Sequence, residues 1–168
     1  MELLTAEITL CDHLREREKN ILKILAMPAN KYKMEDYHRL RVEIKKLKTL
    51  LELVNYCNKD FQKKKYFKPF IKIFKQSGKI RKLQQEESIL EMYDVSKIEK
   101  YLIRVKVDIK KNKKEFQFLI EKKHKIKIKK TFKKVAPYLK ELPSHKINDF
   151  IKKFTAIRTF FKRVGLTQ

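Results

Sequence analysis

A row of basic side chains recurs at helical spacing in the segment YHRLRVEIKKLKTLLELV, residues 37–54. His38, Arg41, Lys45 and Lys48 stand at i, i+3, i+7 and i+10, so on a helix they fall within about 80° of one another. We call these four residues the basic ridge. Arginine can grip two oxygens of one phosphate, lysine supplies a point charge, and protonated histidine donates a hydrogen bond. The chemistry that this spacing favours is the binding of a chain of anions.

The same segment also carries an apolar sector, formed by Leu40, Ile44, Leu47 and Leu51. An amphipathic helix is therefore predicted, and the competing interpretation of the ridge is an ordinary solvated face. Solvated faces usually mix charge signs at i,i+4. Here only Glu52, at the far end, interrupts the positive charges. This pattern favours a binding role for the ridge.

A second copy of the pattern lies near the end of the chain. HRLRVEIKKLK (38–48) and HKINDFIKKFT (145–155) share the leading histidine, the isoleucine at the seventh place and the Lys-Lys pair that follows it. Asn148 and Thr155 replace the arginine and the last lysine of the first copy. The repeat hints at two helices related by internal pseudo-two-fold symmetry, each presenting histidine and lysine to a shared groove.

The composition predicts an all-α fold. Hydrophobic residues make up 42% of the 168 residues, enough for one core, and two glycines and four prolines leave few turn residues for hairpins. We expect a single domain, residues 1–168, folded as an antiparallel helical bundle. The expected helices cover residues 1–27, 34–58, 79–93, 97 to about 134, and 145–164, the last ended by Gly165.

Several local signals set the expected helix boundaries. Pro69 predicts a break in the basic-aromatic segment 61–79, and Gly78 predicts a helix boundary. Ser96 opens the sequence SKIE, which matches a capping box. Ser144 is the expected N-cap of the final helix. The segment HKIKIKK (124–130) alternates like a strand, but a lone strand has no pairing partner in this chain, so helix is favoured.

The net charge of +24 implies a polyanionic partner: nucleic acid, an anionic membrane or a phosphate polymer. A lysine-rich surface without a specific ligand is the alternative. The two cysteines form no CxxC pair, the acidic start is unlike a secretory leader, and no segment has the roughly 18 apolar residues of a membrane span. A reduced, cytoplasmic protein is expected.

The sequence offers little for catalysis. It contains no glycine-rich phosphate loop, no context for a serine or cysteine nucleophile, and no histidine or cysteine spacing typical of a metal site. We therefore expect neither an enzyme nor a cofactor.

At the basic ridge the sequence resembles the CHAD family, the conserved histidine α-helical domains. The family pattern H-x-x-R-V-x-x-[KR]-[KR]-L-[KR] is matched by His38, Arg41, Val42, Lys45, Lys46, Leu47 and Lys48. A later family motif is similar to SGKIRKLQQ, which keeps Gly78, Arg81 and Leu83 but lacks aspartates at 82 and 84. The family's second histidine motif would correspond to His145, Lys152 and Lys153.

The resemblance implies a compact helical bundle with internal pseudo-symmetry, whose basic groove binds inorganic polyphosphate without catalysis. The principal expected ligands are the four ridge residues, with Lys46 and Arg81 behind them and His145 and Lys152 in the second half. Two other functions stay open: a nucleic-acid-associated basic protein and a scaffold for an acidic protein. For nucleic acid, the stacking surface would be Tyr66, Phe67, Phe70 and Phe74, although aromatic residues at this spacing more often form a core.

Overall fold

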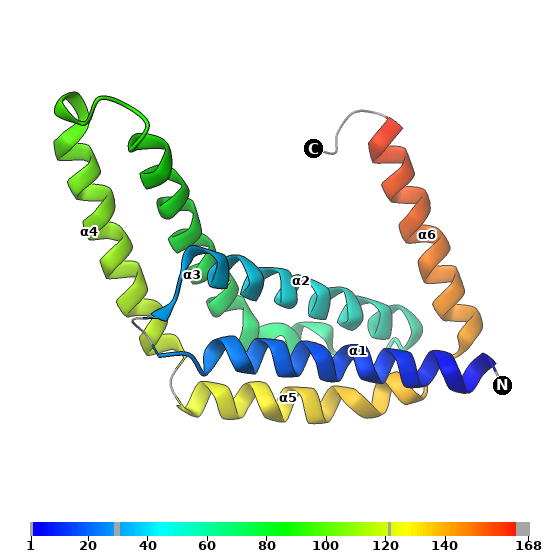
Figure 1. Cartoon of the computed structure of the whole chain (residues 1–168). Helices are drawn as coiled ribbons and strands as arrows, with labels where there is room; N and C mark the ends of the chain where they lie inside the picture. The colour runs from blue at the N-terminus through cyan, green and yellow to red at the C-terminus, as the bar shows by residue number, and fades with distance from the viewer. Residues whose placement is uncertain (1, 29–30, 121, 164–168) are drawn as a thin grey trace.

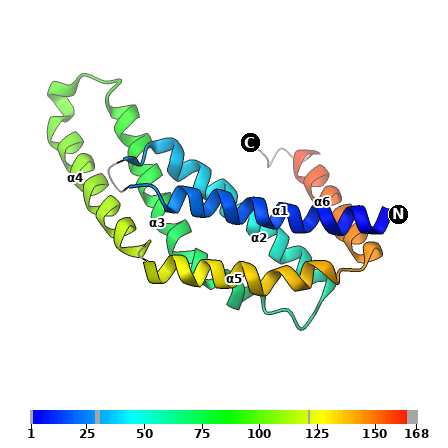
Figure 2. The ribbon, with the colours of Figure 1, turned by 60° about the horizontal axis from the view of Figure 1, so that its bottom comes forward.

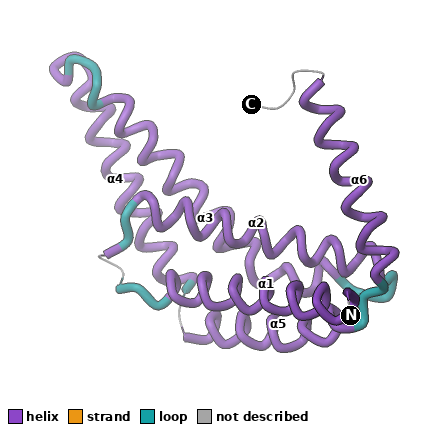
Figure 3. Tube along the Cα trace, turned by 45° about the vertical axis from the view of Figure 1, so that its right-hand side comes forward, coloured by secondary structure: helices purple, strands orange, loops and turns teal. Residues whose placement is uncertain are grey.

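The computed structural model describes residues 2–28, 31–120 and 122–163 and consists, over these residues, of six helices joined by short loops (Figure 1). All-α architecture is therefore confirmed, and Figure 3 shows no strand in the described residues. The helices are α1 (Glu2–Leu25), α2 (Met34–Cys57), α3 (Lys63–Leu90), α4 (Val95–Leu119), α5 (Lys122–Lys140) and α6 (Ser144–Arg163).

The helices form a body with two projecting arms. In the body, α2 and α5 run antiparallel to α1, and the first part of α3 lies beneath α2 (Figures 1 and 2). The rest of α3 pairs with α4 in a hairpin that leaves the body at one end, and α6 leaves it at the other end. The ribbon thus has the outline of an open U, with α2 along the inside of its base.

The core of the body is built from the apolar stripes of its helices. The predicted apolar sector of α2 is confirmed, because Leu40, Ile44, Leu47 and Leu51 are at most 1% exposed. Burial of each such side chain stabilises the fold by about 1.5–3 kcal/mol. The stripe of α2 therefore faces the core, and the basic ridge is centred about 110° from it around the same helix.

The predicted break at Pro69 and boundary at Gly78 are both wrong, because α3 runs continuously from Lys63 to Leu90. Proline inside a helix costs about 3 kcal/mol, since it removes one backbone hydrogen bond and its ring crowds the preceding turn. Phe70 and Ile73 lie one and four residues after Pro69, and both are fully buried. Their burial is of the size needed to offset that cost, so tertiary packing overrides the local signal.

The long helix expected from residue 97 to about 134 is also wrong, because the chain turns at Ile120 and forms α4 and α5. The turn lets α5 run back along α1, where Ile128, Phe132 and Val135 become buried. Helix rather than strand over 124–130 is confirmed.

Neither predicted N-cap residue is an N-cap in the structure. The structure begins α4 at Val95, so Ser96 lies inside the helix and not at its N-cap. Ser144 is the first residue of α6 and not its N-cap, although the predicted start of this helix near residue 145 is confirmed. The predicted end at Gly165 lies outside the described residues.

An aromatic cluster joins the α3–α4 arm to the body. The ring of Tyr37, at the start of α2, lies 5.4 Å from Tyr32 and 5.2 Å from Phe116, near the end of α4. The Tyr32 hydroxyl donates a hydrogen bond to the Ile24 carbonyl at 2.6 Å. Burial raises the pKa of Tyr37 to about 12, with Asp36 adding to the rise. The basic ridge therefore begins directly after a fixed, buried residue.

Candidate polyanion-binding site

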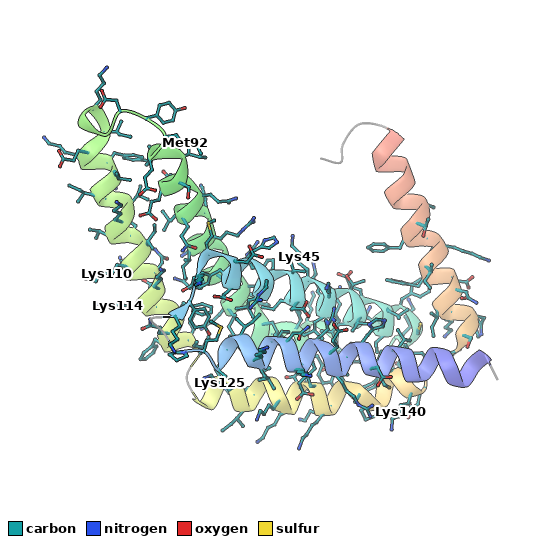
Figure 4. All side chains as sticks on the ribbon, in the orientation of Figure 1. Lys45, Met92, Lys110, Lys114, Lys125 and Lys140 are labelled. Atoms are coloured by element: carbon teal, nitrogen blue, oxygen red, sulfur yellow. The ribbon has the colours of Figure 1, made fainter. Side chains whose placement is uncertain are left out.

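The basic ridge lies on the side of α2 that faces the space between the two arms. Figure 4 shows Lys45 on this side, near the middle of the helix. Lys45 and Lys48 are exposed, whereas His38 and Arg41 are half-buried. All four residues are on one helix face, as their spacing predicts, but their surroundings differ.

Arg41 is held in place by α3. Its Nη1 donates a hydrogen bond to the Phe74 carbonyl at 2.6 Å, and its guanidinium carbon lies 4.0 Å from the centre of the Phe74 ring. A Cβ at residue 78 would lie only 2.3 Å from Nη1, so Gly78 leaves the room that the guanidinium occupies. The close approach of Arg41 therefore explains why residue 78 is a glycine. Arg41 and Gly78 belong to two different motifs of the family resemblance, and the structure brings them into contact.

A second arginine lies close to the first. The pKa of Arg41 is lowered mainly by burial and further by the positive charge of Arg81. Among the described residues, neither arginine has a carboxylate within 4.0 Å, and neither does Lys45. Two neighbouring guanidinium groups without a counterion repel each other, and a bound anion would remove that repulsion.

The other predicted lysines of α2 have acidic partners. Lys48 lies 3.7 Å from Glu52, which also contacts Lys63, and Lys46 lies 3.3 Å from Glu43. Both lysines are about half exposed, so these ion pairs are weak and an anion could displace them. Lys46 is nevertheless rotated about 100° from Lys45 around the helix and so lies off the ridge.

Glu43, the partner of Lys46, also forms an ion pair with the buried Arg17, and this pair joins α2 to α1. The distance from Arg17 Nε to the carboxylate is 2.9 Å. Lys46 therefore neutralises part of the carboxylate that joins α2 to α1, and we do not include it among the proposed ligands.

The second copy of the pattern is placed differently. Helix α6 contacts α2 through Phe150, whose ring lies 5.6 Å from Tyr56, and through Lys146, which donates a hydrogen bond to the Cys57 carbonyl at 3.0 Å. His145 and Lys152 are exposed, and each is rotated by about 100° or more from these contact residues around the helix. The structure therefore does not bring these two residues together with the basic ridge.

The aromatic residues of 63–75 belong to the core. Phe70 is fully buried, Tyr66 stacks on Phe61 with centres 4.8 Å apart, and Phe74 lies beneath Arg41. The expectation that these rings form a core is confirmed. They are not an exposed surface on which nucleic-acid bases could stack.

Three cavities lie away from the ridge. They occupy about 180 Å³ between α1 and α2, 380 Å³ between α3 and α4, and 690 Å³ between α1 and α5. None of the three is lined by a ridge residue. In the described part of the chain, no group of three His, Cys, Asp or Glu side chains could hold a metal ion, and no helix could span a membrane.

Sequence reasoning missed one residue of this site, Phe74, which holds Arg41 with both its ring and its carbonyl. The helix boundary predicted at Gly78 had separated Phe74 from Arg81 in the expected elements. A continuous amphipathic pattern over 63–90 was the signal that could have placed all three on one helix.

Comparisons of the chain with protein-family models, with curated proteins and with solved structures give no match. A function for this chain therefore has to be argued from the geometry and charge of the site.

Proposed function

We propose that this protein binds inorganic polyphosphate, without catalysis, through the inner side of α2 and the adjoining part of α3. The central ligands are Arg41, Arg81 and Lys45, with His38 and Lys48 extending the row. The observation that carries the proposal is the pair of neighbouring arginines without a carboxylate partner among the described residues. The resemblance of the ridge to the CHAD motif supports the same ligand.

The geometry suits a linear polymer of phosphates. His38 and Lys45 are seven residues apart, which is about 10 Å along the helix axis. Arg41 stands between them in the sequence and contacts α3, the helix that carries Arg81. Arg41 uses Nη1 for the Phe74 carbonyl, while its Nε and Nη2 have no hydrogen-bond partner among the described residues. These donors can bind phosphate oxygens without a loss of the contact that positions the side chain.

A competition titration tests the proposal. Labelled long-chain polyphosphate is bound to the wild type, to the double variant Lys45→Gln/Arg81→Gln, and to the control Lys133→Gln/Lys134→Gln on α5, where both lysines are exposed. The two variants lose the same charge. We expect the first to weaken binding about tenfold and the control to weaken it much less, because charge-assisted hydrogen bonds exist only at the site.

Challenge of the bound label with single- and double-stranded DNA over a salt series distinguishes the alternatives. We expect polyphosphate to outcompete DNA at equal phosphate concentration. If DNA competes equally well, and if both double variants lose the same affinity, then the ridge attracts polyanions only through its general positive charge. Binding of an acidic polypeptide in preference to either polymer would favour the scaffold function.

A further inference from the structure

Helix α4 has two opposite apolar faces, and only one of them is covered. Leu102, Val105, Ile109 and Phe116 are buried on the inner face, toward α3 and the body. Ile103, Val107 and Phe118 are 55%, 60% and 75% exposed. At about 100° per residue these three cluster roughly 160° around the helix from the buried set. The second face is therefore not an extension of the core.

Lysines are interleaved with the three exposed apolar residues. Lys100, Lys110 and Lys114 fall in the same sector, and Figure 4 shows Lys110 and Lys114 on the outer side of the arm, directed away from the body. Of the acidic residues of α4, Asp108 and Glu115 lie about 90° or more from the centre of this sector, and Glu99 lies about 65° from it on the other side. Glu115 accepts a hydrogen bond from Gln76 of α3. We call the six residues Lys100, Ile103, Val107, Lys110, Lys114 and Phe118 the outer face of α4.

We propose that the outer face of α4 docks on the surface of an anionic lipid membrane. Interfacial helices combine an apolar face that enters the headgroup region with lysines that meet anionic lipids. Ile103 to Phe118 covers about 22 Å of helix, long enough to lie along a bilayer surface. This function goes beyond polyphosphate binding and uses residues on a different element.

Charge argues against a second copy of the chain as the occupant. Two such faces brought together around a two-fold axis would place lysines against lysines in a protein of net charge +24. The face is also one convex helix with its pairing helix, α3, behind it, so it forms no groove for a partner helix. A flat, negatively charged lipid surface matches both its charge and its shape.

The absence of tryptophan from the chain allows a direct test. The variant Val107→Trp places a single tryptophan in the outer face, and the control Ile126→Trp places one on α5, where Ile126 is 44% exposed between Lys125 and Lys129. Vesicles contain phosphatidylcholine alone or mixed with phosphatidylserine. With mixed vesicles we expect the Val107→Trp emission to shift to shorter wavelength and to be quenched by brominated lipid. The control should show neither effect.

Flotation with the same vesicles measures the binding itself. The variant Val107→Gln/Phe118→Gln keeps every charge, and we expect it to bind mixed vesicles about tenfold more weakly than the wild type. Its affinity for polyphosphate should be unchanged, which separates this inference from the proposed function. Unchanged flotation of the variant, or an equal emission shift in the Ile126→Trp control, would overturn the proposal. A monomer–dimer equilibrium abolished by the same variant would assign the face to a second copy.

Discussion

Helices α2 and α6 carry the same sequence pattern in two very different surroundings. Ile44 and Ile151 occupy the seventh place of each copy, yet Ile44 is 1% exposed and Ile151 is 54% exposed. Helix α2 lies between α1 and α3 in the body, whereas α6 projects from the end of α2 (Figure 1). The pattern by itself therefore specifies an amphipathic basic helix, and its neighbours decide whether the helix is part of the core.

The comparison also separates the basic residues of the two copies. On α2 the arginine of the pattern meets α3, where Phe74 and Gly78 receive it and Arg81 adds a second charge. On α6 the corresponding place holds Asn148, which is exposed. Of the two copies, only the one on α2 therefore carries a concentrated positive charge fixed in position, because α3 crosses α2 at the arginine of the pattern.

The largest expected difference is in stability. Ile44→Ala should lower the free energy of unfolding by about 2–5 kcal/mol, because it opens a cavity in the core, and Ile151→Ala should lower it by less than about 1 kcal/mol. Urea denaturation followed by circular dichroism measures both values. Equal losses would show that α6 is buried in solution to the same extent as α2.

A smaller difference is expected in polyphosphate affinity. Lys45 and Lys152 occupy the eighth place of each copy and are both exposed. Lys45→Gln should weaken binding about threefold, since Lys45 lies on the same helix face as the guanidinium of Arg41, whereas Lys152→Gln should weaken it less than about twofold. Titration of both variants at one salt concentration provides the test. Equal effects would place the ligand on both helices.

The smallest expected effect is that of Gly78→Ala on the free energy of unfolding, which should change sign when Arg41 is removed. Gly78→Ala favours the helix by about 1 kcal/mol but displaces the Arg41 guanidinium from the Phe74 carbonyl, so we expect a small net loss of stability in the wild type. In the Arg41→Ala background the same change should stabilise the protein by up to about 1 kcal/mol. Thermal unfolding of the four proteins measures this cycle. A gain in both backgrounds would mean that the Arg41 contact contributes nothing.

The sequence was sufficient to predict the fold class, the helices α1, α2 and α6, and the basic ridge. Apolar spacing predicted α2 and its buried sector, because burial of one helix face is a local periodic property. It was not sufficient for α3, because the proline and the glycine were interpreted by their local preferences alone. Whether a helix continues through Pro69 depends on the burial of Phe70 and Ile73, which only the surrounding helices provide.

What the sequence alone determined is therefore the helical periodicity, the large positive charge and the set of basic residues that share one face of α2. Only the tertiary structure decided which of them are held in place. The crossing of α2 and α3 brings Arg41 to Phe74, Gly78 and Arg81, whereas Lys46 turns to Glu43 and α6 carries His145 and Lys152 elsewhere. The physical reason is that spacing along a chain fixes directions around one helix axis, while distances between two helices depend on how their side chains pack.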